Sequence, residues 1–191
     1  MSMPKLIPEY KELIKTKIIQ AAGRAFVEKG FRGATMDDIA GNAGLSKPTL
    51  YAYFENKQDI LRAGFKAMGG VLNPEYYEEH DSLDALEGIS DVIIGLKEVI
   101  PLTFEILSLT SEDETLRKIY LDYYNGMVES LEIFLKKQQD KGTVRGDIDA
   151  HTLAKILMDI PFGIYVQLSL TQSDENIKEY WSNLLEAILK K

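Results

Sequence analysis

The stretch from Thr35 to Lys57, TMDDIAGNAGLSKPTLYAYFENK, constrains the fold of this chain more than any other part of it. Thr35 occupies the position of a helix N-cap. Asp37 and Asp38 follow in the first turn, where carboxylates favour the positive end of the helix dipole. Gly44 is expected to end this helix. The first part of the stretch therefore predicts a short helix that a glycine ends.

The second part of the stretch predicts another short helix with one buried and one exposed side. Ser46 can cap this helix, and Pro48 falls in its first turn, where the missing N–H costs little. Leu50 and Phe54 stand four residues apart and are expected to face inward. The residues expected to face outward carry a cation, hydroxyls and flat rings, and they are Lys47, Pro48, Thr49, Tyr51 and Tyr53.

Two helices joined at a glycine form a helix-turn-helix, whose second helix enters the major groove of DNA while flanking groups hold phosphates. The outward side chains suit phosphates, base edges and thymine methyl groups. Lys57, with its backbone N–H at the start of the next helix, is expected to hold a phosphate. Glycine-hinged helix pairs are also common in proteins that bind no DNA. In that alternative, Tyr51 and Tyr53 are half-buried packing residues.

The charge distribution agrees with a DNA-binding head. The whole chain has a net charge of −8, but residues 1–70 hold 11 Lys/Arg against 7 Asp/Glu, a balance of +4. Residues 71–191 hold 11 against 23, a balance of −12. A basic end on an acidic body is expected where one end meets phosphate. A solvated acidic surface and chance would give the same numbers, so charge leaves both interpretations open.

Composition restricts the remaining classes of protein. With 191 residues, of which 45% are hydrophobic and 27% charged, the chain is expected to bury the core of one ordinary domain or two small ones. It has no cysteine, which excludes disulfides, thiolate metal sites and a cysteine nucleophile. The first residues lack the apolar segment of a secretory signal, and uninterrupted apolar runs are short. We therefore expect a cytoplasmic protein without a membrane-spanning segment.

Helical periodicity without strand alternation predicts an all-α chain of about nine helices. The first helix is expected over residues 10–29, with a stop at Gly30. A further helix is expected over residues 82–100. Asp149 is expected to cap a later helix, in which Pro161 removes one hydrogen bond and introduces a kink.

The segment FVEKGFRGATMDDIAGNAGLSKPTLYAYFENKQDIL resembles the N-terminal domain of the tetracycline-repressor (TetR) family of transcriptional regulators. The matching features are the F…KG ending of the first helix, T…IA..AG.S across the second, and LY.YF.NK..L after it. The match covers about residues 10–65. The resemblance implies a three-helix helix-turn-helix DNA-binding domain over residues 1–56 and a helical ligand-binding and dimerisation domain over residues 57–191.

The resemblance also implies a homodimer whose two heads enter successive major grooves of a palindromic operator. The residues implied to face the groove are Ser46, Lys47, Pro48, Thr49 and Tyr51, and those on the phosphate side are Tyr53, Lys57 and Thr35. Met36 departs from the family pattern, because some members carry there a basic residue that reads a base.

The body of such proteins dimerises through its last two helices and encloses a small-molecule pocket between the preceding ones. The apolar positions that suit an interface across a two-fold axis are Ile156, Ile160, Ile164, Leu168, Ile177, Trp181, Leu184 and Ile188. Aromatic side chains with polar tips beside a pliable methionine suit an adaptable pocket, and these are Phe104, Tyr120, Tyr123, Tyr124, Met127, Phe162 and Tyr165. In the alternative, both sets are ordinary core residues of one subunit.

Other chemistry is not expected. Residues 78–81, Glu-Glu-His-Asp, are consecutive and lack the spacing of a helical metal site, and His151 stands alone. Because no nucleophile–base pair, phosphate-binding glycine loop or zinc spacing occurs, we expect no enzyme, no metal and no cofactor. The leading hypothesis is a repressor that a small apolar or aromatic effector releases from DNA. The alternatives are a ligand-binding protein whose head has lost operator reading, a non-regulatory DNA organiser and, least supported, an enzyme.

Overall fold

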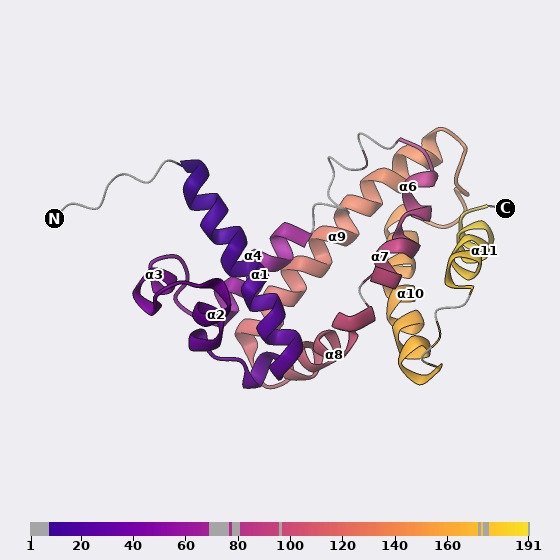
Figure 1. The fold of residues 1–191 in the computed structure, drawn as a ribbon. Helices are drawn as coiled ribbons and strands as arrows, with labels where there is room; N and C mark the ends of the chain where they lie inside the picture. Colours follow the sequence, from indigo (N-terminus) through magenta and orange to yellow (C-terminus); the bar gives the residue numbers. More distant parts are fainter. Residues whose placement is uncertain are drawn as a thin grey trace. The chain divides into compact units, whose positions relative to one another are not determined.

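All regular secondary structure in the described part of the chain is helical, so the expected all-α fold class is confirmed. The computed structural model describes residues 8–68, 77, 81–95, 97–171, 173 and 176–190 (Figure 1). The chain divides into two compact units, one of Met1–Met68 with Pro101–Tyr120 and one of Gly69–Ile100 with Leu121–Lys191.

The first unit joins the expected DNA-binding head to later helices. It contains α1 (Pro8–Gly33), α2 (Met36–Ala43), α3 (Lys47–Tyr51), α4 (Lys57–Met68), most of α8 (Ile100–Leu109) and the first turns of α9 (Glu114–Asp140). One buried cluster draws on these helices, with Ile18, Phe26, Ile39, Leu50, Ile60, Ile106 and Leu116 among its members. The division expected after residue 56 does not coincide with this unit, because α4 and α8 share the core of the head.

The caps of the helix-turn-helix form where the sequence predicts them. Thr35 and Asp38 make a capping box, in which each side chain accepts a hydrogen bond from the backbone N–H of the other residue. Gly44 ends α2 in the left-handed region at φ 60°. Ser46 then caps α3. Local chemistry therefore fixes both ends of the turn between α2 and α3.

The second unit contains α6 (Asp84–Glu87), α7 (Ile89–Gly95), the 3-10 helix η2 (Lys97–Val99), the rest of α9, α10 (Ala150–Thr171) and α11 (Ile177–Leu189). The expectation of one helix over 82–100 is wrong, because the chain there divides into α6, α7 and η2. Gly88 ends α6 and Gly95 ends α7, and glycine is disfavoured inside helices. The indole N–H of Trp181 donates to the Leu86 carbonyl oxygen at 2.7 Å, next to the first break.

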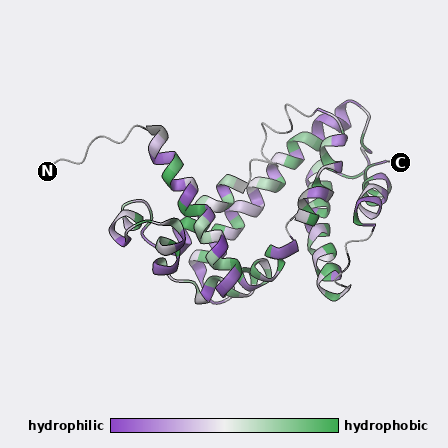
Figure 2. Ribbon diagram, viewed as in Figure 1, coloured by the Kyte–Doolittle hydropathy of each residue, from purple (hydrophilic) through white to green (hydrophobic). Residues whose placement is uncertain are grey.

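Helix α10 begins after the expected cap, Asp149, which accepts a hydrogen bond from the Thr152 N–H at 2.9 Å. It continues past Pro161 as one helix. By length and composition alone, α10 is apolar enough to cross a membrane. The sequence expectation overlooked it because hydrophilic residues interrupt its apolar ones (Figure 2). Leu153 and Leu157 on one of its faces are buried in the core of the second unit, as in a core helix.

Candidate nucleic-acid interface

Helix α3 has the outward side that the sequence predicts. Lys47, Pro48 and Tyr51 are exposed, and Thr49 is half-buried. Leu50, by contrast, is completely buried. Because α3 is anchored by Leu50 and capped at its start, its polar and aromatic side chains are held on a fixed surface of the first unit.

Two other residues of the expected interface pack against the core. Tyr53 is half-buried there, so the packing alternative describes Tyr53 better than the exposed Tyr51. Met36 is also half-buried against the same core. Its thioether carries no charge, so it cannot act as the basic group that the family resemblance implies at this position in some members.

The hydroxyls of Ser46 and Thr35 are engaged in helix caps. Ser46 Oγ accepts a hydrogen bond from the Thr49 N–H at 3.2 Å and lies 2.7 Å from the Thr49 hydroxyl. The Thr35 hydroxyl donates to the Asp38 carboxylate at 2.7 Å. Hydrogen bonds from Lys29 and then from Thr35 lower the pKa of Asp38 to about 2. Both hydroxyls therefore position the helices that carry the exposed side of α3.

The Lys57 ammonium is occupied within the first unit. It donates to the carbonyl oxygens of Phe31, Arg32 and Ala34 at 2.6, 3.0 and 3.0 Å, and burial lowers its pKa. An ammonium has three N–H donors, and these carbonyls use all of them. These contacts therefore argue against a phosphate role for the Lys57 side chain. Its backbone N–H, in the first turn of α4, is left by helix geometry without an intrahelical partner and keeps that prediction open.

A carboxylate from α8 holds the turn that precedes the helix-turn-helix. Glu105 accepts hydrogen bonds from the backbone N–H groups of Phe31 and Arg32 at 2.9 and 2.8 Å. The turn starts at Gly30, whose φ of 72° and ψ of 162° interrupt α1 where the sequence predicts a stop. A Cβ on Gly30 would lie 2.7 Å from a Glu105 carboxylate oxygen. Residues 30–34 are thus held by Glu105 through N–H groups and by Lys57 through carbonyls, an arrangement we call the turn clamp.

Sequence reasoning missed Glu105, although a signal was present. The helix IPLTFEILSL contains a single charged residue among apolar and hydroxyl side chains. A lone carboxylate in such a helix needs a partner, because burying an unpaired charge is costly. The partner is backbone more than seventy residues earlier in the chain, which no local pattern could identify.

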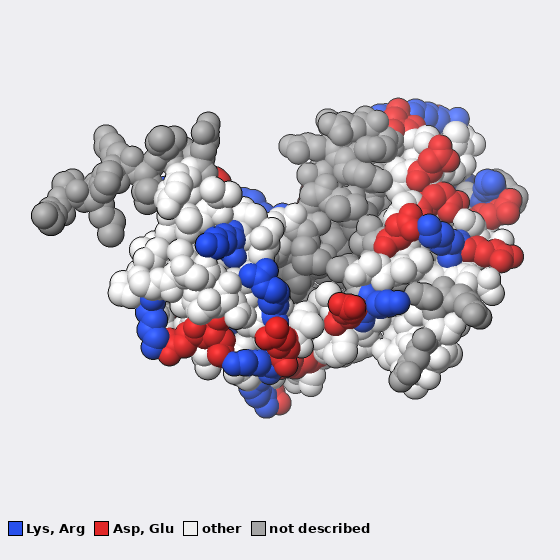
Figure 3. Space-filling view, in the orientation of Figure 1, with Lys and Arg blue, Asp and Glu red and all other residues white. Residues whose placement is uncertain are grey.

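Lys47 is exposed but paired. Its ammonium lies 2.5 Å from an Asp37 carboxylate oxygen, and this contact raises the pKa of Lys47. Other cations of the head are paired with carboxylates in the same way. Figure 3 accordingly shows Lys and Arg side chains interleaved with Asp and Glu on the face of the first unit that it draws. The balance of +4 therefore does not appear as a uniformly basic surface on that face.

The expected effector group is divided between the two units. Phe104 and Tyr120 belong to the first unit, where the Tyr120 ring meets Phe65 edge-on at 5.9 Å between centroids. The members of the group that belong to the second unit lie on α9 and α10, and they are Tyr123, Tyr124, Met127, Phe162 and Tyr165.

The second-unit members are half-buried, and the three tyrosines among them carry neutral hydroxyl groups. Tyr124 donates to Asp159 at 2.8 Å, and the rings of Phe162 and Tyr165 meet edge-on at 6.4 Å. Burial raises the pKa of Tyr123, and it is the largest cause that raises those of Tyr124 and Tyr165 to about 12. These phenols therefore stay protonated at neutral pH. Apolar rings with neutral polar tips are suited to a lipophilic ligand.

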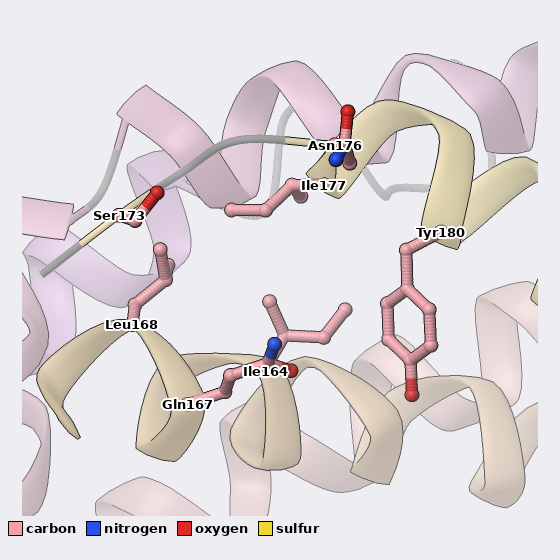
Figure 4. Close-up of a pocket in the computed structure, with 7 residues that line it drawn as sticks. All are labelled: Ile164, Gln167, Leu168, Ser173, Asn176, Ile177 and Tyr180. Carbon is pink, nitrogen blue, oxygen red and sulfur yellow. The ribbon is translucent and has the colours of Figure 1, made fainter. Parts of the chain in front are cut away.

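One pocket of about 250 Å³ lies elsewhere, between the end of α10 and the start of α11 (Figure 4). Its lining residues are Ile164, Gln167, Leu168, Ser173, Asn176, Ile177 and Tyr180. None of them belongs to the expected effector group. Within the described residues no cluster of three or more His, Asp or Glu side chains could hold a metal ion. Residues 78–80 lie outside the described residues, and His151 lies 2.7 Å from Glu132.

Half of the residues expected at a dimer interface are core residues of one chain. Ile164, Leu168 and Ile177 are buried, and Trp181 is completely buried. For these four, burial favours the alternative of packing inside one subunit, because a buried side chain offers little surface to a partner. Ile160, Leu184 and Ile188 are half-buried, and Ile156 is exposed. The other exposed large hydrophobic residues of α10 and α11 are Val166, Leu170 and Tyr180.

Comparison with known proteins identifies the head. Residues 18–63 match the model of the bacterial regulatory proteins of the tetR family. The chain is 29% identical over 172 residues to the HTH-type transcriptional regulator YfiR of Bacillus subtilis, covering 84% of this chain and 82% of that protein. It is 23% identical over 183 residues to the transcriptional repressor AcnR of Corynebacterium glutamicum, covering 93% of each.

The fold is shared along nearly the whole chain. The structure of the regulator FadR from Bacillus subtilis, in complex with stearoyl-CoA, superimposes with a TM-score of 0.74 at 22% identity. The superposition covers 92% of this chain and 97% of FadR. The matched head, the relatives aligned along most of their length and the capped helix-turn-helix agree: residues 18–63 form a head of the tetR family, and the chain as a whole is similar to proteins that are transcriptional regulators rather than enzymes.

Proposed function

We propose that this protein is a cytoplasmic, ligand-responsive repressor that binds a palindromic operator as a homodimer and is released by a small lipophilic effector. The observation that carries the proposal is the exposed side of α3, held by the Ser46 cap and the buried Leu50. A short helix fixed in this way can present side chains to base edges without reordering.

The residues on the exposed side of α3 are proposed to have two roles, contact with the bases and orientation of the helix. Lys47, Thr49 and Tyr51 are the side chains proposed to meet base edges and thymine methyl groups. Ser46 and Pro48 lie at the start of α3 and set its approach to the groove. The DNA phosphates are proposed to be contacted by the backbone N–H of Lys57 and by Thr35 and Tyr53.

Exposed apolar side chains on the last two helices support the homodimer. Leu170 is 80% exposed, and Val166, Tyr180 and Ile156 are exposed beside polar residues. An apolar set on α10 and α11 suits a self-complementary surface, which a two-fold axis requires. Such a dimer is proposed to place its two α3 helices roughly 34–36 Å apart, the distance of one turn of DNA.

The second-unit aromatic group supports a lipophilic effector. Tyr123, Tyr124 and Tyr165 combine apolar rings with protonated hydroxyls. Phe162 adds a further apolar ring, and Met127 can adapt its shape beside them. The complex of FadR with stearoyl-CoA supports the same chemical class, since its ligand carries a long acyl chain. An effector that binds better to a dimer with unsuitable head spacing releases DNA by shifting the population.

Gel shifts with the DNA upstream of the protein's own gene test this function. A salt-sensitive, sequence-selective complex is expected, and Tyr51→Ala should weaken it at least tenfold, whereas Tyr51→Phe keeps the ring and should retain most affinity. Sedimentation of the parent should give a dimer, and Leu170→Glu with Val166→Glu should give a folded monomer. If no upstream fragment gives a selective complex, the head does not read an operator, and the alternative of a ligand-binding protein without operator reading takes its place.

A further inference from the structure

We infer that Asp37 is a specificity residue of the DNA-binding head, which holds the Lys47 ammonium in the free protein and thereby weakens binding to non-operator DNA. The inference rests on the proposed function, since it requires α3 to meet DNA. It concerns a residue on α2, which lies outside the set of side chains proposed to contact the operator.

The geometry joins the two helices of the helix-turn-helix through their charged side chains. Asp37 lies in the first turn of α2, and Lys47 is the first residue of α3. Lys47 Nζ lies 2.5 Å from Asp37 Oδ2, with side-chain exposures of 60% and 57%. The capping box of α2 uses Thr35 and Asp38, so Asp37 is not needed for that cap. Its carboxylate is directed instead to a cation that the DNA would meet.

The Asp37–Lys47 pair is part of a wider pattern in the head. In the described part of residues 1–68, at least four more cations lie within 4 Å of a carboxylate oxygen, in the pairs Lys15–Glu12, Lys29–Asp38, Arg32–Glu112 and Arg62–Asp59. Lys57 in turn is saturated by carbonyl groups. Lys47 differs from these cations because it alone stands on the exposed side of α3. Pairing at this position therefore acts where DNA is read.

The pair affects operator and non-operator DNA differently. Binding to non-operator DNA comes almost entirely from cations that meet phosphates and release counterions. A phosphate must compete with Asp37 for Lys47, and the released carboxylate then repels the DNA backbone. On an operator Lys47 is instead proposed to meet base edges, farther from the phosphates that the Asp37 carboxylate repels, so the pair reduces affinity less there. Asp37 therefore increases the ratio of operator affinity to non-operator affinity, which decides occupancy in a genome.

Asp37→Asn tests the inference, because it keeps the shape of the side chain and removes its charge. The dissociation constants of full-length parent and variant are measured by fluorescence anisotropy, from about 50 to 200 mM salt, with the selective upstream fragment and a scrambled duplex of equal length. The variant should bind the scrambled duplex about three- to tenfold more tightly, with a salt slope steeper by about 0.9 per head. Affinity for the selective fragment should change less, so the ratio of selective-fragment affinity to scrambled-duplex affinity should fall.

Three controls separate the pair from other effects of charge. Glu12→Gln removes the same charge and an exposed pair on α1, and it should leave the ratio unchanged. Asp37→Glu keeps the carboxylate and should behave like the parent. In a Lys47→Gln background, Asp37→Asn should change scrambled-duplex affinity by less than about twofold.

Each result decides between the two proposals. The inference is overturned if the ratio of selective-fragment affinity to scrambled-duplex affinity is unchanged or higher in Asp37→Asn. It is also overturned if Asp37→Asn changes scrambled-duplex affinity equally in the Lys47→Gln background, because the effect would then come from long-range charge. These outcomes leave the repressor function intact, because they presuppose a selective fragment. Failure to find any selective fragment would instead refute the repressor function.

Discussion

Replacing Gly30 by alanine should strongly destabilise the first unit. Gly30 has φ 72° and ψ 162°, a backbone region that is essentially restricted to glycine, and placing another residue there costs about 1–3 kcal/mol. The new Cβ would also lie 2.7 Å from a Glu105 carboxylate oxygen. Glu105 must therefore move away from the N–H groups of Phe31 and Arg32, to which it is bound at 2.9 and 2.8 Å.

The lost contacts add to the backbone cost. Hydrogen bonds to a charged group contribute about 1.5–3 kcal/mol each, and partial exposure of this site places the pair of bonds at about 2 kcal/mol together. Alanine lowers the entropy of the unfolded chain and returns about 0.5–1 kcal/mol. The net loss in the free energy of unfolding is about 3 kcal/mol, a large fraction of the 5–15 kcal/mol that is usual for a domain.

Urea unfolding followed by far-ultraviolet circular dichroism measures this loss. Gly23→Ala is the matched control, since Gly23 lies in the helical part of α1 with open space around its Cβ position, and it should be stabilising by about 0.5–1 kcal/mol. The double variant Gly30→Ala with Glu105→Ala should lose less than the sum of the single losses, because both remove the same contact. A Gly30→Ala protein within about 0.5 kcal/mol of the parent would refute the steric reasoning.

The other predictions concern Lys57, Asp38 and Tyr124. Lys57→Met should lower the free energy of unfolding by about 1–3 kcal/mol through the loss of its carbonyl contacts, while leaving the salt slope of DNA binding unchanged. A weaker salt dependence of DNA binding in Lys57→Met would show that the Lys57 side chain does contact a phosphate. The pKa of Asp38 is lowered to about 2 from 3.8, so its contribution to stability is complete above pH 3.8 and disappears as the pH falls towards 2. In Asp38→Asn the free energy of unfolding should depend less on pH between 3.8 and 2 than in the parent. An unchanged pH dependence would contradict the pairing of Asp38 with Lys29 and Thr35. The pKa of Tyr124 is raised to about 12, so its native-state advantage is complete below pH 10 and disappears as the pH rises through 12. Ultraviolet titration should show late tyrosinate formation by Tyr124 and Tyr165, and Tyr124→Phe should reduce its amplitude by the share of one tyrosine. An unchanged amplitude in Tyr124→Phe would show that Tyr124 does not titrate late.

Features that depend on neighbouring residues were predictable from the sequence. The caps at Thr35 and Ser46, the helix end at Gly44 and the inward Leu50 form as expected. Each is decided within about four residues, by a side chain that satisfies an open backbone group or by the period of the helix. The exposed side of α3 follows from the same information.

Features that depend on distant partners were not predictable. Lys57 binds carbonyls 23 to 26 residues away, and no pattern around Lys57 indicates them. The apolar periodicity of α10 and α11 shows which side of each helix is buried, but not whether the same subunit or a partner buries it. Ile164 and Trp181 were therefore assigned to a dimer interface, although their own subunit buries them. The helix expected over 82–100 failed for two reasons. Gly88 and Gly95 were local signals that the prediction did not use, and the Trp181 indole, which binds the Leu86 carbonyl beside the first break, is a distant partner.

The turn clamp has a consequence for exchanging heads between regulators. A chimera that joins residues 1–56 to a foreign body would lack Glu105 and replace Lys57, the two residues that hold the turn before α2. Its reading helix would be intact in sequence, yet the turn that supports it would lose both anchors. The exchangeable module of this protein therefore comprises two separate pieces of chain, the head through α4 and the helix α8, and a successful transplant has to carry both.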